Sequence, residues 1–137
     1  MSSEISLSIV RSWNTAEIVD LYRAGGWWDV GYDSNQIPRL LDGSFLVIVA
    51  MDEHENAVGF GRFISDGASD GYVQDIVVFP EFRGQGIGSR IVAALKKLAI
   101  LYGHTWIGLI SAPGKEAFYR RAGFSEMEKY TPMLKEE

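Results

Sequence analysis

Residues 73–88 read VQDIVVFPEFRGQGIG, an apolar run that leads directly into a turn with three glycines. The glycines at positions 84, 86 and 88 let the backbone come close to a bound group, because no Cβ atom blocks the approach. The amphipathic stretch that follows predicts a helix, whose first N–H groups have no partner within the helix and point toward the turn. The sequence therefore predicts an anion site at residues 83–88, and pyrophosphate is the anion that we favour.

The pattern on both sides of this stretch predicts a mixed α/β fold. Polar turns separate apolar runs at 45–49, 58–63 and 72–79, which is typical of three consecutive antiparallel strands. Apolar residues then recur at intervals of three and four over 84–101, as on a helix face that packs on a sheet. Because this helix is a crossover, the strand at 106–110 should lie parallel to the strand at 72–79. The other expected elements are a strand of about eight residues from Ile5, a helix from Asn14 to Gly25, a short helix around 38–41, a helix over 115–122 capped by Gly123, and strand material over 124–134.

The composition is that of a soluble globular protein, and we expect residues 1–137 to form a single domain. No stretch approaches the ~20 apolar residues of a membrane span, and the first residues lack the features of a secretory signal, so we expect a cytoplasmic protein. The absence of cysteine excludes disulfides, thiolate metal sites and cysteine nucleophiles. A net charge of −5 argues against a nucleic-acid partner and is compatible with a cationic small molecule.

Two passages resemble the GNAT superfamily of acyl-CoA-dependent N-acetyltransferases. Residues 73–88 match the family signature Arg/Gln-x-x-Gly-x-Gly/Ala, and residues 117–124, AFYRRAGF, match its Phe-Tyr-x-x-x-Gly-Phe pattern. The two passages occur in the family's order, about thirty residues apart, and the expected elements follow the family fold over nearly the whole chain. The resemblance implies that strands one to four are antiparallel, that strands four and five are parallel and splayed around the cofactor, and that about four helices cover the sheet.

The resemblance implies acetyl-CoA as the cosubstrate. Backbone N–H groups of the glycine turn would hold the CoA pyrophosphate, with Arg83 and Arg90 adding positive charge, and the fourth strand would bind the pantetheine arm. One alternative is a tight strand-to-helix connection without a ligand. Another is a nicotinamide-binding turn, which is disfavoured because such a turn normally follows the first strand of its unit. The expected cofactor-binding residues are Ile76, Val77, Val78, Arg83, Gly84, Gln85, Gly86, Ile87, Gly88 and Ser89.

Tyr119 resembles the family tyrosine that lies near the sulfur and protonates the departing CoA thiolate as a general acid. The alternative is that Tyr119 is a core aromatic beside Phe118. Ala112 stands where the family often has asparagine, a departure that affects one side-chain contact to the cofactor.

The acceptor amine must be neutral to attack, so a base or a water chain has to take its proton. The candidate bases are Asp75, Glu81 and Asp66. The pair Gln74-Asp75 occupies the place where the spermidine/spermine N-acetyltransferases, which this passage resembles, carry two acidic residues that face the amine. Because neighbours on a strand point to opposite faces, only one of the pair can line the cleft unless a bulge intervenes. We favour Asp75 as catalytic and substrate-binding residue; the alternative is a solvated carboxylate.

Trp27, Trp28, Tyr32 and Asp33 lie in the region that forms the acceptor wall in GNAT proteins. Such rings beside a carboxylate would suit an amine on an apolar or aromatic body, through stacking and cation–π contact. Alternatively, Trp27 and Trp28, or at least one of them, fill the core or a dimer interface. His54 and His104 have no companions at ligand spacing, so we expect surface or helix-end positions for them and no metal site.

These features favour an enzyme in which a primary amine, small and cationic or aromatic, attacks the thioester carbonyl of acetyl-CoA directly. An N–H of the fourth strand would stabilise the developing oxyanion, and no acyl-enzyme is expected. The alternative is a non-catalytic acyl-CoA-binding sensor or regulatory module. A homodimer through strand edges and the carboxyl-terminal region is also expected. The fold does not choose among polyamines, arylalkylamines, amino sugars and peptides.

Overall fold

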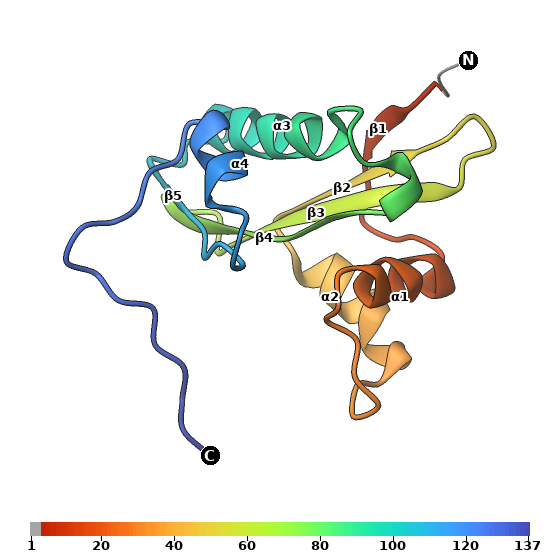
Figure 1. Cartoon of the computed structure of the whole chain (residues 1–137), viewed down its shortest axis with the longest axis horizontal. Helices are drawn as coiled ribbons and strands as arrows, with labels where there is room; N and C mark the ends of the chain where they lie inside the picture. Colours follow the sequence, from red (N-terminus) through yellow and green to blue (C-terminus); the bar gives the residue numbers. More distant parts are fainter. Residues whose placement is uncertain (1–3) are drawn as a thin grey trace.

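The computed structural model describes residues 4–137, which form a five-stranded sheet with helices on both faces (Figure 1). The sheet order is β1-β2-β3-β4-β5, with antiparallel pairing from β1 to β4 and parallel pairing between β4 and β5, as the sequence predicted. The strands are β1 (Ser6–Ile9), β2 (Leu46–Met51), β3 (Ala57–Ser65), β4 (Asp70–Val78) and β5 (Trp106–Gly108). The helices are α1 (Thr15–Ala24), α2 (Ile37–Gly43), α3 (Ile87–Leu101) and α4 (Glu116–Arg121), with the short 3₁₀ turns η1 (Ser34–Gln36) and η2 (Pro80–Phe82).

Side chains of the central strands alternate between two apolar cores. Leu46, Ile48 and Ala50 of β2 pack on the α3 side of the sheet, whereas Val47 and Val49 pack on the side of α1 and α2. This alternation follows from the two-residue period of a strand. A sheet buried on both faces gives the site a rigid support.

The capping signal at Asn14 starts α1, and its partner residue ties the helix to the sheet. Asn14 Oδ1 accepts the backbone N–H of Glu17 at 3.0 Å. The Glu17 carboxylate accepts Trp13 Nε1–H at 3.1 Å and the backbone N–H of Ala57, at the start of β3, at 2.6 Å. The carboxylate therefore fixes α1 against the strand that precedes the site.

Helix α3 begins later than its apolar repeat predicted. The pattern placed the start at Gly84, but Gly84 and Gly86 have φ angles of +80° and +78°, which a right-handed helix does not allow. The turn therefore continues to Gly86, and α3 starts at Ile87. From there Ile87, Ile91 and Leu95 are buried, as expected.

The strand expected over 124–134 is wrong. Residues 125–137 form no strand, and Figure 1 shows this segment leading away from the sheet after α4. Met133 and Leu134 are 89% and 93% exposed. The physical reason is that a strand gains stability only from pairing, and Pro132 has no N–H to give to a ladder. β1 and β5 are also shorter than predicted, with four and three residues.

His104 lies at the end of α3, as one of the two expectations for it stated, but it is buried rather than on the surface. Its Nδ1 donates to the carbonyl of Ala99 at 3.0 Å, and its Nε2 lies 2.7 Å from Ser65 Oγ. The rings of Phe45 and Phe63 both approach it with centroids at 4.9 Å. His104 thus joins the end of α3 to the end of β3.

Candidate functional site

The edge of β4 that faces β5 is mostly open. β5 pairs only with residues 70–72, although β4 continues to Val78. The Phe79 N–H donates to the Val58 carbonyl on β3 at 2.9 Å, so the backbone groups of Val78 point to the opposite, open edge. The two strands therefore diverge after three residue pairs, as the splayed arrangement predicted from the sequence requires.

The same alternation distinguishes the three residues expected to bind the pantetheine arm. Ile76 and Val78 direct their backbone groups to the open edge, whereas Val77, which is paired with Phe60, directs its groups toward β3. Arg83 Nε donates to the Val78 carbonyl at 3.0 Å, which fastens the glycine turn to the end of β4. The backbone of Ile76 and the N–H of Val78 are the groups left for an extended ligand.

Two of the three glycines in the turn are needed for their backbone conformation. Gly84 and Gly86 have positive φ angles, and no atom lies within 4 Å of where their Cβ atoms would stand, so these positions need glycine for conformation. A Cβ on Gly88 would lie 3.4 Å from Cζ of Phe118, an ordinary van der Waals distance, so the Phe118 ring lies close to the first turn of α3. The two motifs of the sequence are therefore neighbours in the structure.

Arg90 lies away from the expected anion position. Its guanidinium donates to the Ile5 carbonyl at 3.1 Å, beside the start of β1. Gln85 is exposed in the turn, and Ile87 is buried beneath it. The anion-binding capacity of the turn thus comes from backbone N–H groups and the start of α3.

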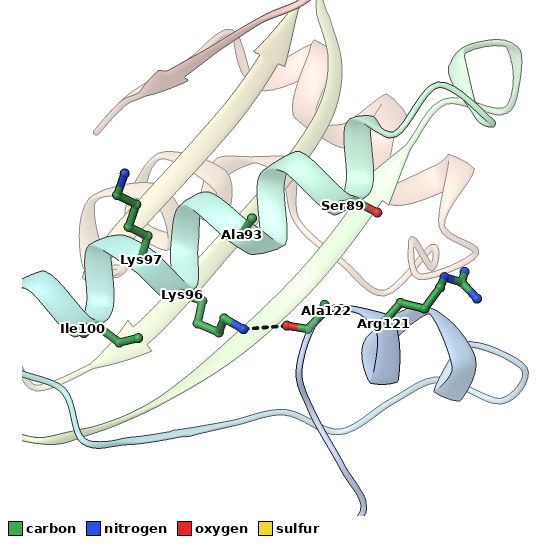
Figure 2. A pocket seen from close by; sticks show the side chains of 7 residues that line it. All are labelled: Ser89, Ala93, Lys96, Lys97, Ile100, Arg121 and Ala122. Carbon is green, nitrogen blue, oxygen red and sulfur yellow. Dashed lines mark hydrogen bonds between the residues drawn. The ribbon is translucent and has the colours of Figure 1, made fainter.

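A pocket of about 440 Å³ opens between α3 and α4, next to the glycine turn (Figure 2). It carries three basic side chains that sequence reasoning missed. The signal was present, because Ser89, Ala93, Lys96 and Ile100 follow one another at helical spacing along one face of α3. The pocket is lined by Ser89, Ala93, Lys96, Lys97, Ile100, Arg121 and Ala122.

One of these basic residues has a structural task. Lys96 Nζ donates to the Ala122 carbonyl at 2.6 Å and lies 5.5 Å from the ring centre of Phe124 (Figure 2). Gly123, which ends α4 with φ +94° as predicted, leaves room for this ammonium group, because a Cβ there would lie 2.6 Å from Nζ. Lys96 therefore anchors α4 on α3.

Tyr119 lies on α4, half-buried between two aromatic rings. Its ring centroid is 5.0 Å from that of Phe118 and 6.3 Å from that of Phe124. No side chain among residues 4–137 hydrogen-bonds its hydroxyl. Burial, and after it the negative charge of Asp75, raises the pKa of Tyr119. The phenol therefore stays protonated at neutral pH, and the two expected catalytic residues interact electrostatically.

A β-bulge decides the direction of Asp75. Arg62 pairs with Gln74 and Phe60 with Val77, so β4 has one residue more than β3 between these pairs. Asp75 has φ +61°, in the left-handed region. The bulge resolves the conflict noted in the sequence: both Gln74 and Asp75 face α1 and α2.

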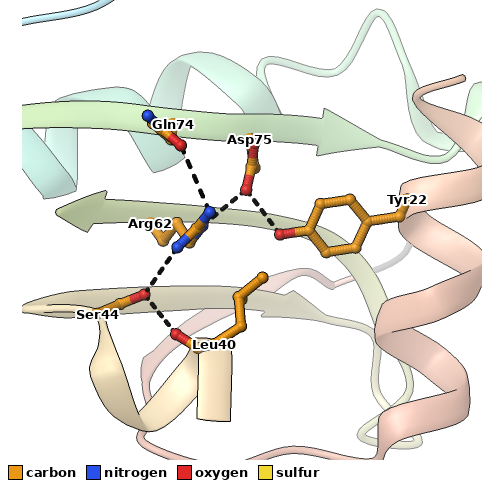
Figure 3. Close-up of polar contacts among 6 residues, drawn as sticks. All are labelled: Tyr22, Leu40, Ser44, Arg62, Gln74 and Asp75. Atoms are coloured by element: carbon orange, nitrogen blue, oxygen red, sulfur yellow. Dashed lines mark hydrogen bonds and ion pairs between the residues drawn. The ribbon is translucent and has the colours of Figure 1, made fainter. Parts of the chain in front are cut away.

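Asp75 is held by two donors (Figure 3). Its Oδ2 accepts the Tyr22 hydroxyl at 2.6 Å and Arg62 Nε–H at 2.7 Å. Arg62 also makes longer contacts of 3.4 Å to Ser44 Oγ and to Gln74 Oε1. Burial and the neighbouring carboxylate raise the pKa of Tyr22. With Oδ2 occupied, Oδ1 is the oxygen that Asp75 can offer to an incoming amine.

The aromatic residues of the expected acceptor wall gather around Tyr22. Trp27 and Trp28 approach its ring with centroids at 6.0 and 6.3 Å, and Tyr32 lies 5.6 Å from Trp28. Trp27 and Tyr32 are exposed, whereas Trp28 packs against the core, as the alternative interpretation held for one of the two tryptophans. Tyr22 itself was missed as a site residue. Its signal was a tyrosine on an apolar helix face, since a buried hydroxyl needs a partner.

The other two candidate bases lie outside this network. Asp66 Oδ1 accepts the Ala68 N–H at 2.9 Å within the turn between β3 and β4, and Glu81 is exposed in η2. Residues 4–137 contain no cluster of three or more potential metal-ligating His, Cys, Asp or Glu side chains. Over the same range, no helix is both long and apolar enough to cross a membrane.

Comparison with known proteins places this geometry in a family. The family model for the acetyltransferase (GNAT) domain matches residues 43–126, more than half of the chain. A protein of Porphyra purpurea, named uncharacterized N-acetyltransferase ycf52, is 27% identical over 124 residues, which cover 88% of this chain and 70% of the relative. The probable glucosamine 6-phosphate N-acetyltransferase 2 of Oryza sativa subsp. japonica is 35% identical over 65 residues, 47% of this chain and 39% of the relative.

Solved structures have the same fold over almost the full length. The GNAT family acetyltransferase SP0256 of Streptococcus pneumoniae is 26% identical, with a TM-score of 0.78 and coverage of 98% of both chains. SA2161 of meticillin-resistant Staphylococcus aureus, described as a probable acetyltransferase, has a TM-score of 0.84 at 18% identity and covers 98% of this chain and 99% of its own. The aminoglycoside acetyltransferase AAC(6')-Iy, solved with a bisubstrate analogue of CoA and monomethyl-acetylneamine, has a TM-score of 0.76 at 17% identity, with 98% and 99% covered.

Proposed function

Because the chain belongs to the GNAT family of acetyltransferases, we propose that it transfers the acetyl group of acetyl-CoA to a primary amine. One observation carries this proposal. Phe118, the neighbour of Tyr119 on α4, lies close to Gly88 in the first turn of α3, beside the open edge of β4. In the roles proposed here, an anion site, a slot for an extended arm and a proton donor would thus be adjacent, in the order in which CoA presents its pyrophosphate, pantetheine and sulfur.

The cofactor would run from the α3–α4 pocket to Tyr119. Backbone N–H groups at the start of α3 would bind the pyrophosphate, and the open edge of β4 at Ile76 and Val78 would pair with the pantetheine amides. Lys97 and Arg121, on the pocket between α3 and α4, would attract the phosphate at the adenosine end. The structural neighbour AAC(6')-Iy, solved with a CoA-based analogue, supports this choice of cofactor.

The reaction would be a direct displacement at the thioester. The amine lone pair forms a C–N bond to the acetyl carbonyl, and a β4 N–H stabilises the oxyanion. The C–S bond then breaks, and Tyr119 gives its proton to the departing thiolate. The ammonium formed on the acceptor loses its proton to Asp75 Oδ1 or to water.

A small cationic or aromatic amine is the acceptor that the site supports best. Asp75 offers one carboxylate oxygen, and the exposed ring of Trp27 lies close to its partner Tyr22. The exposed ring of Tyr32 packs on Trp28, which also lies beside Tyr22. The net charge of −5 favours a cationic partner. Small amines are also named for the relatives, a glucosamine phosphate in one and a neamine derivative in another.

Release of free thiol from acetyl-CoA tests the proposal. The full chain is incubated with acetyl-CoA and a panel that holds a polyamine, an arylalkylamine, an amino sugar and a lysine peptide. We expect thiol release that depends on at least one amine, and an acetylated product of the expected mass. Measurable CoA binding without any amine-dependent release would instead support the acyl-CoA-binding sensor.

Two further expectations from the sequence belong to this proposal. A homodimer is supported by the free edge of β5 and by exposed apolar side chains of the segment 125–137, such as Tyr130, Met133 and Leu134. Sedimentation velocity of the purified chain measures this directly. The cytoplasmic location stays a prediction, and so does a single domain over residues 1–137.

A further inference from the structure

An exposed aromatic pair lies on the sheet at some distance from the predicted acceptor wall. Tyr72 of β4 and Trp106 of β5 pack edge to face, with ring centroids 5.1 Å apart and an interplanar angle of 68°. Tyr72 is 46% exposed and Trp106 is 37% exposed. Neither residue has a role in the sites described above. Large aromatic side chains that stay exposed side by side often mark a binding surface.

This pair faces the same side as Asp75. A side chain on Gly71 would run into the ring of Phe63, which belongs to the core under α3, so Tyr72 next to Gly71 faces the opposite side. Gln74, two residues further along β4, shares this side and contacts Arg62. In Figure 1, α1 and α2 lie below the right part of the sheet, whereas β5 lies at the left. The helices therefore leave this end of the face open.

The Trp106 ring lies against its own strand. It lies over Gly108, where a Cβ would stand only 2.6 Å from its Cη2 atom. Tyr72 is the register partner of both Gly108 and Ile64, so an apolar row crosses β3, β4 and β5. The absence of a side chain at Gly108 lets the indole lie down on the strand, and Tyr72 holds its edge. The result is an exposed apolar platform of two rings in contact.

We infer that the Tyr72–Trp106 pair is a subsite for the aromatic body of the acceptor amine. The inference rests on the proposed transfer to a primary amine and deepens it. Asp75 lies three residues beyond Tyr72, about 10 Å along the strand. A ligand ring packed against the side of the Tyr72–Trp106 pair that faces Asp75 covers part of this distance, and a short alkyl chain to the amine covers the rest. The acceptor class is an arylalkylamine, with a primary amine two or three carbons from an aromatic ring.

Substitution of Trp106 tests the subsite against a matched surface aromatic. Thiol release is measured with 2-phenylethylamine and with methylamine for the wild type, Trp106→Ala, Trp106→Phe and the control Tyr102→Ala, an exposed aromatic at the carboxyl end of α3. We expect Trp106→Ala to raise the KM for 2-phenylethylamine at least tenfold while kcat changes less than twofold. The KM for methylamine should not change, and both Trp106→Phe and Tyr102→Ala should remain near the wild type.

A binding measurement keeps this inference separate from the proposed function. Calorimetric titration of 2-phenylethylamine into the CoA-saturated protein needs no turnover. If no amine releases thiol but 2-phenylethylamine binds in a Trp106-dependent way, the subsite stands and the transfer reaction falls. Equal affinity in the wild type and Trp106→Ala, no binding to the wild type, or an equal loss with both amines would overturn the subsite. The subsite would also be overturned if Trp106→Ala changed only the sedimentation coefficient. In that case the Tyr72–Trp106 pair would be a contact between two copies of the chain.

Discussion

At the scale of single residues, Asp75 combines a side chain that is held by two hydrogen bonds with a backbone in the left-handed region. Its carboxylate pairs with Arg62 and Tyr22, and its backbone adopts φ +61°. A left-handed conformation costs a non-glycine residue about 1–3 kcal/mol. The bulge therefore persists because the two donors, which come from α1 and β3, hold the side chain. The same bulge directs Gln74 and Asp75 to one face, so it organises the acceptor side of the site.

This geometry predicts that Asp75→Gly is more stable than Asp75→Ala, the reverse of the usual order in a strand. Asp75→Gly and Asp75→Ala both remove the carboxylate, but only glycine adopts φ +61° without strain. We therefore expect the glycine variant to be the more stable by about 1 kcal/mol, although glycine is usually the weaker residue in a strand. Urea unfolding measures the difference. A more stable alanine variant would show that the bulge relaxes when the carboxylate is lost.

The Tyr22 hydroxyl predicts a dependence of stability on alkaline pH. Its pKa is raised above the ordinary 10.0, so above pH 10 the unfolded chain loses this proton while the folded protein keeps it. The free energy of unfolding therefore falls as the pH rises through this range. Tyr22→Phe should cost about 1–3 kcal/mol at pH 7, because it removes a hydrogen bond to a charged group. Its stability should also fall less steeply above pH 10. Parallel curves for the two proteins would contradict the assignment.

Tyr119→Phe separates proton donation from cofactor binding. The ring packing against Phe118 and Phe124 does not involve the hydroxyl, so the fold and the affinity for acetyl-CoA should be retained. Turnover should fall about tenfold or more, a modest loss for a general acid because a thiolate is already a good leaving group. Thiol release and calorimetric binding of acetyl-CoA are the two measurements. Unchanged turnover would remove Tyr119 from the mechanism and leave it as a core aromatic.

Asp75→Asn should shift the pH dependence of proton donation by Tyr119. The Asp75 charge is the second cause of the raised Tyr119 pKa, so its removal lowers this pKa. A general acid loses activity when it ionises, and the alkaline limb of kcat should therefore move to lower pH in the variant. The position of the limb, measured between pH 7 and pH 11, is the readout, whatever the variant's absolute rate. If the alkaline limb of kcat stays at the same pH in the variant, this limb reports the ionisation of a group other than Tyr119.

At the scale of elements, the glycine turn and α3 could be predicted because their signals are local. Left-handed glycines and an apolar repeat act within a few residues of sequence. The bulge could not be predicted in the same way, because it depends on the register between β3 and β4. The partner of Tyr22 is 53 residues away along the chain. The α3–α4 pocket likewise depends on the packing of two helices, because Lys96 of α3 and Arg121 of α4, which both line it, are 25 residues apart in sequence.

The turn predicts a loss of CoA affinity for Gly86→Ala. Gly86 has φ +78° and open space around it, so an added methyl group causes strain without a clash. A left-handed alanine costs about 1–2 kcal/mol, and if the turn relaxes to avoid this cost, CoA binding should weaken about five- to thirtyfold. Gly43→Ala is the matched control, since Gly43 also has open space but no positive φ. Calorimetry with CoA should detect the loss in the first variant alone.

At the scale of the whole molecule, the prediction of a last strand failed in the segment 125–137. Its residues have the composition of a last strand, yet the structure gives it no partner within residues 4–137. Strand formation is decided by what lies beside a segment, and local sequence does not contain that information. At the opposite side of the sheet, β1 is paired over its four residues with β2. Figure 1 shows the free edge of β5, which precedes α4, and the exposed segment, which follows α4, in the same half of the molecule.

This arrangement predicts that the segment matters for association rather than for folding. In the full chain, Met133→Ser combined with Leu134→Ser changes two side chains that are 89% and 93% exposed. Surface substitutions of this kind alter stability by no more than about 0.5 kcal/mol, so the free energy of unfolding should stay within that range. If copies associate through the segment, the weight-average mass in sedimentation equilibrium should fall toward that of the monomer. A large loss of stability would mean instead that the segment packs on its own sheet in solution, because side chains exposed in a free segment contribute little to folding. If neither the mass nor the stability changes, the segment 125–137 does not mediate association of copies at the β5 edge.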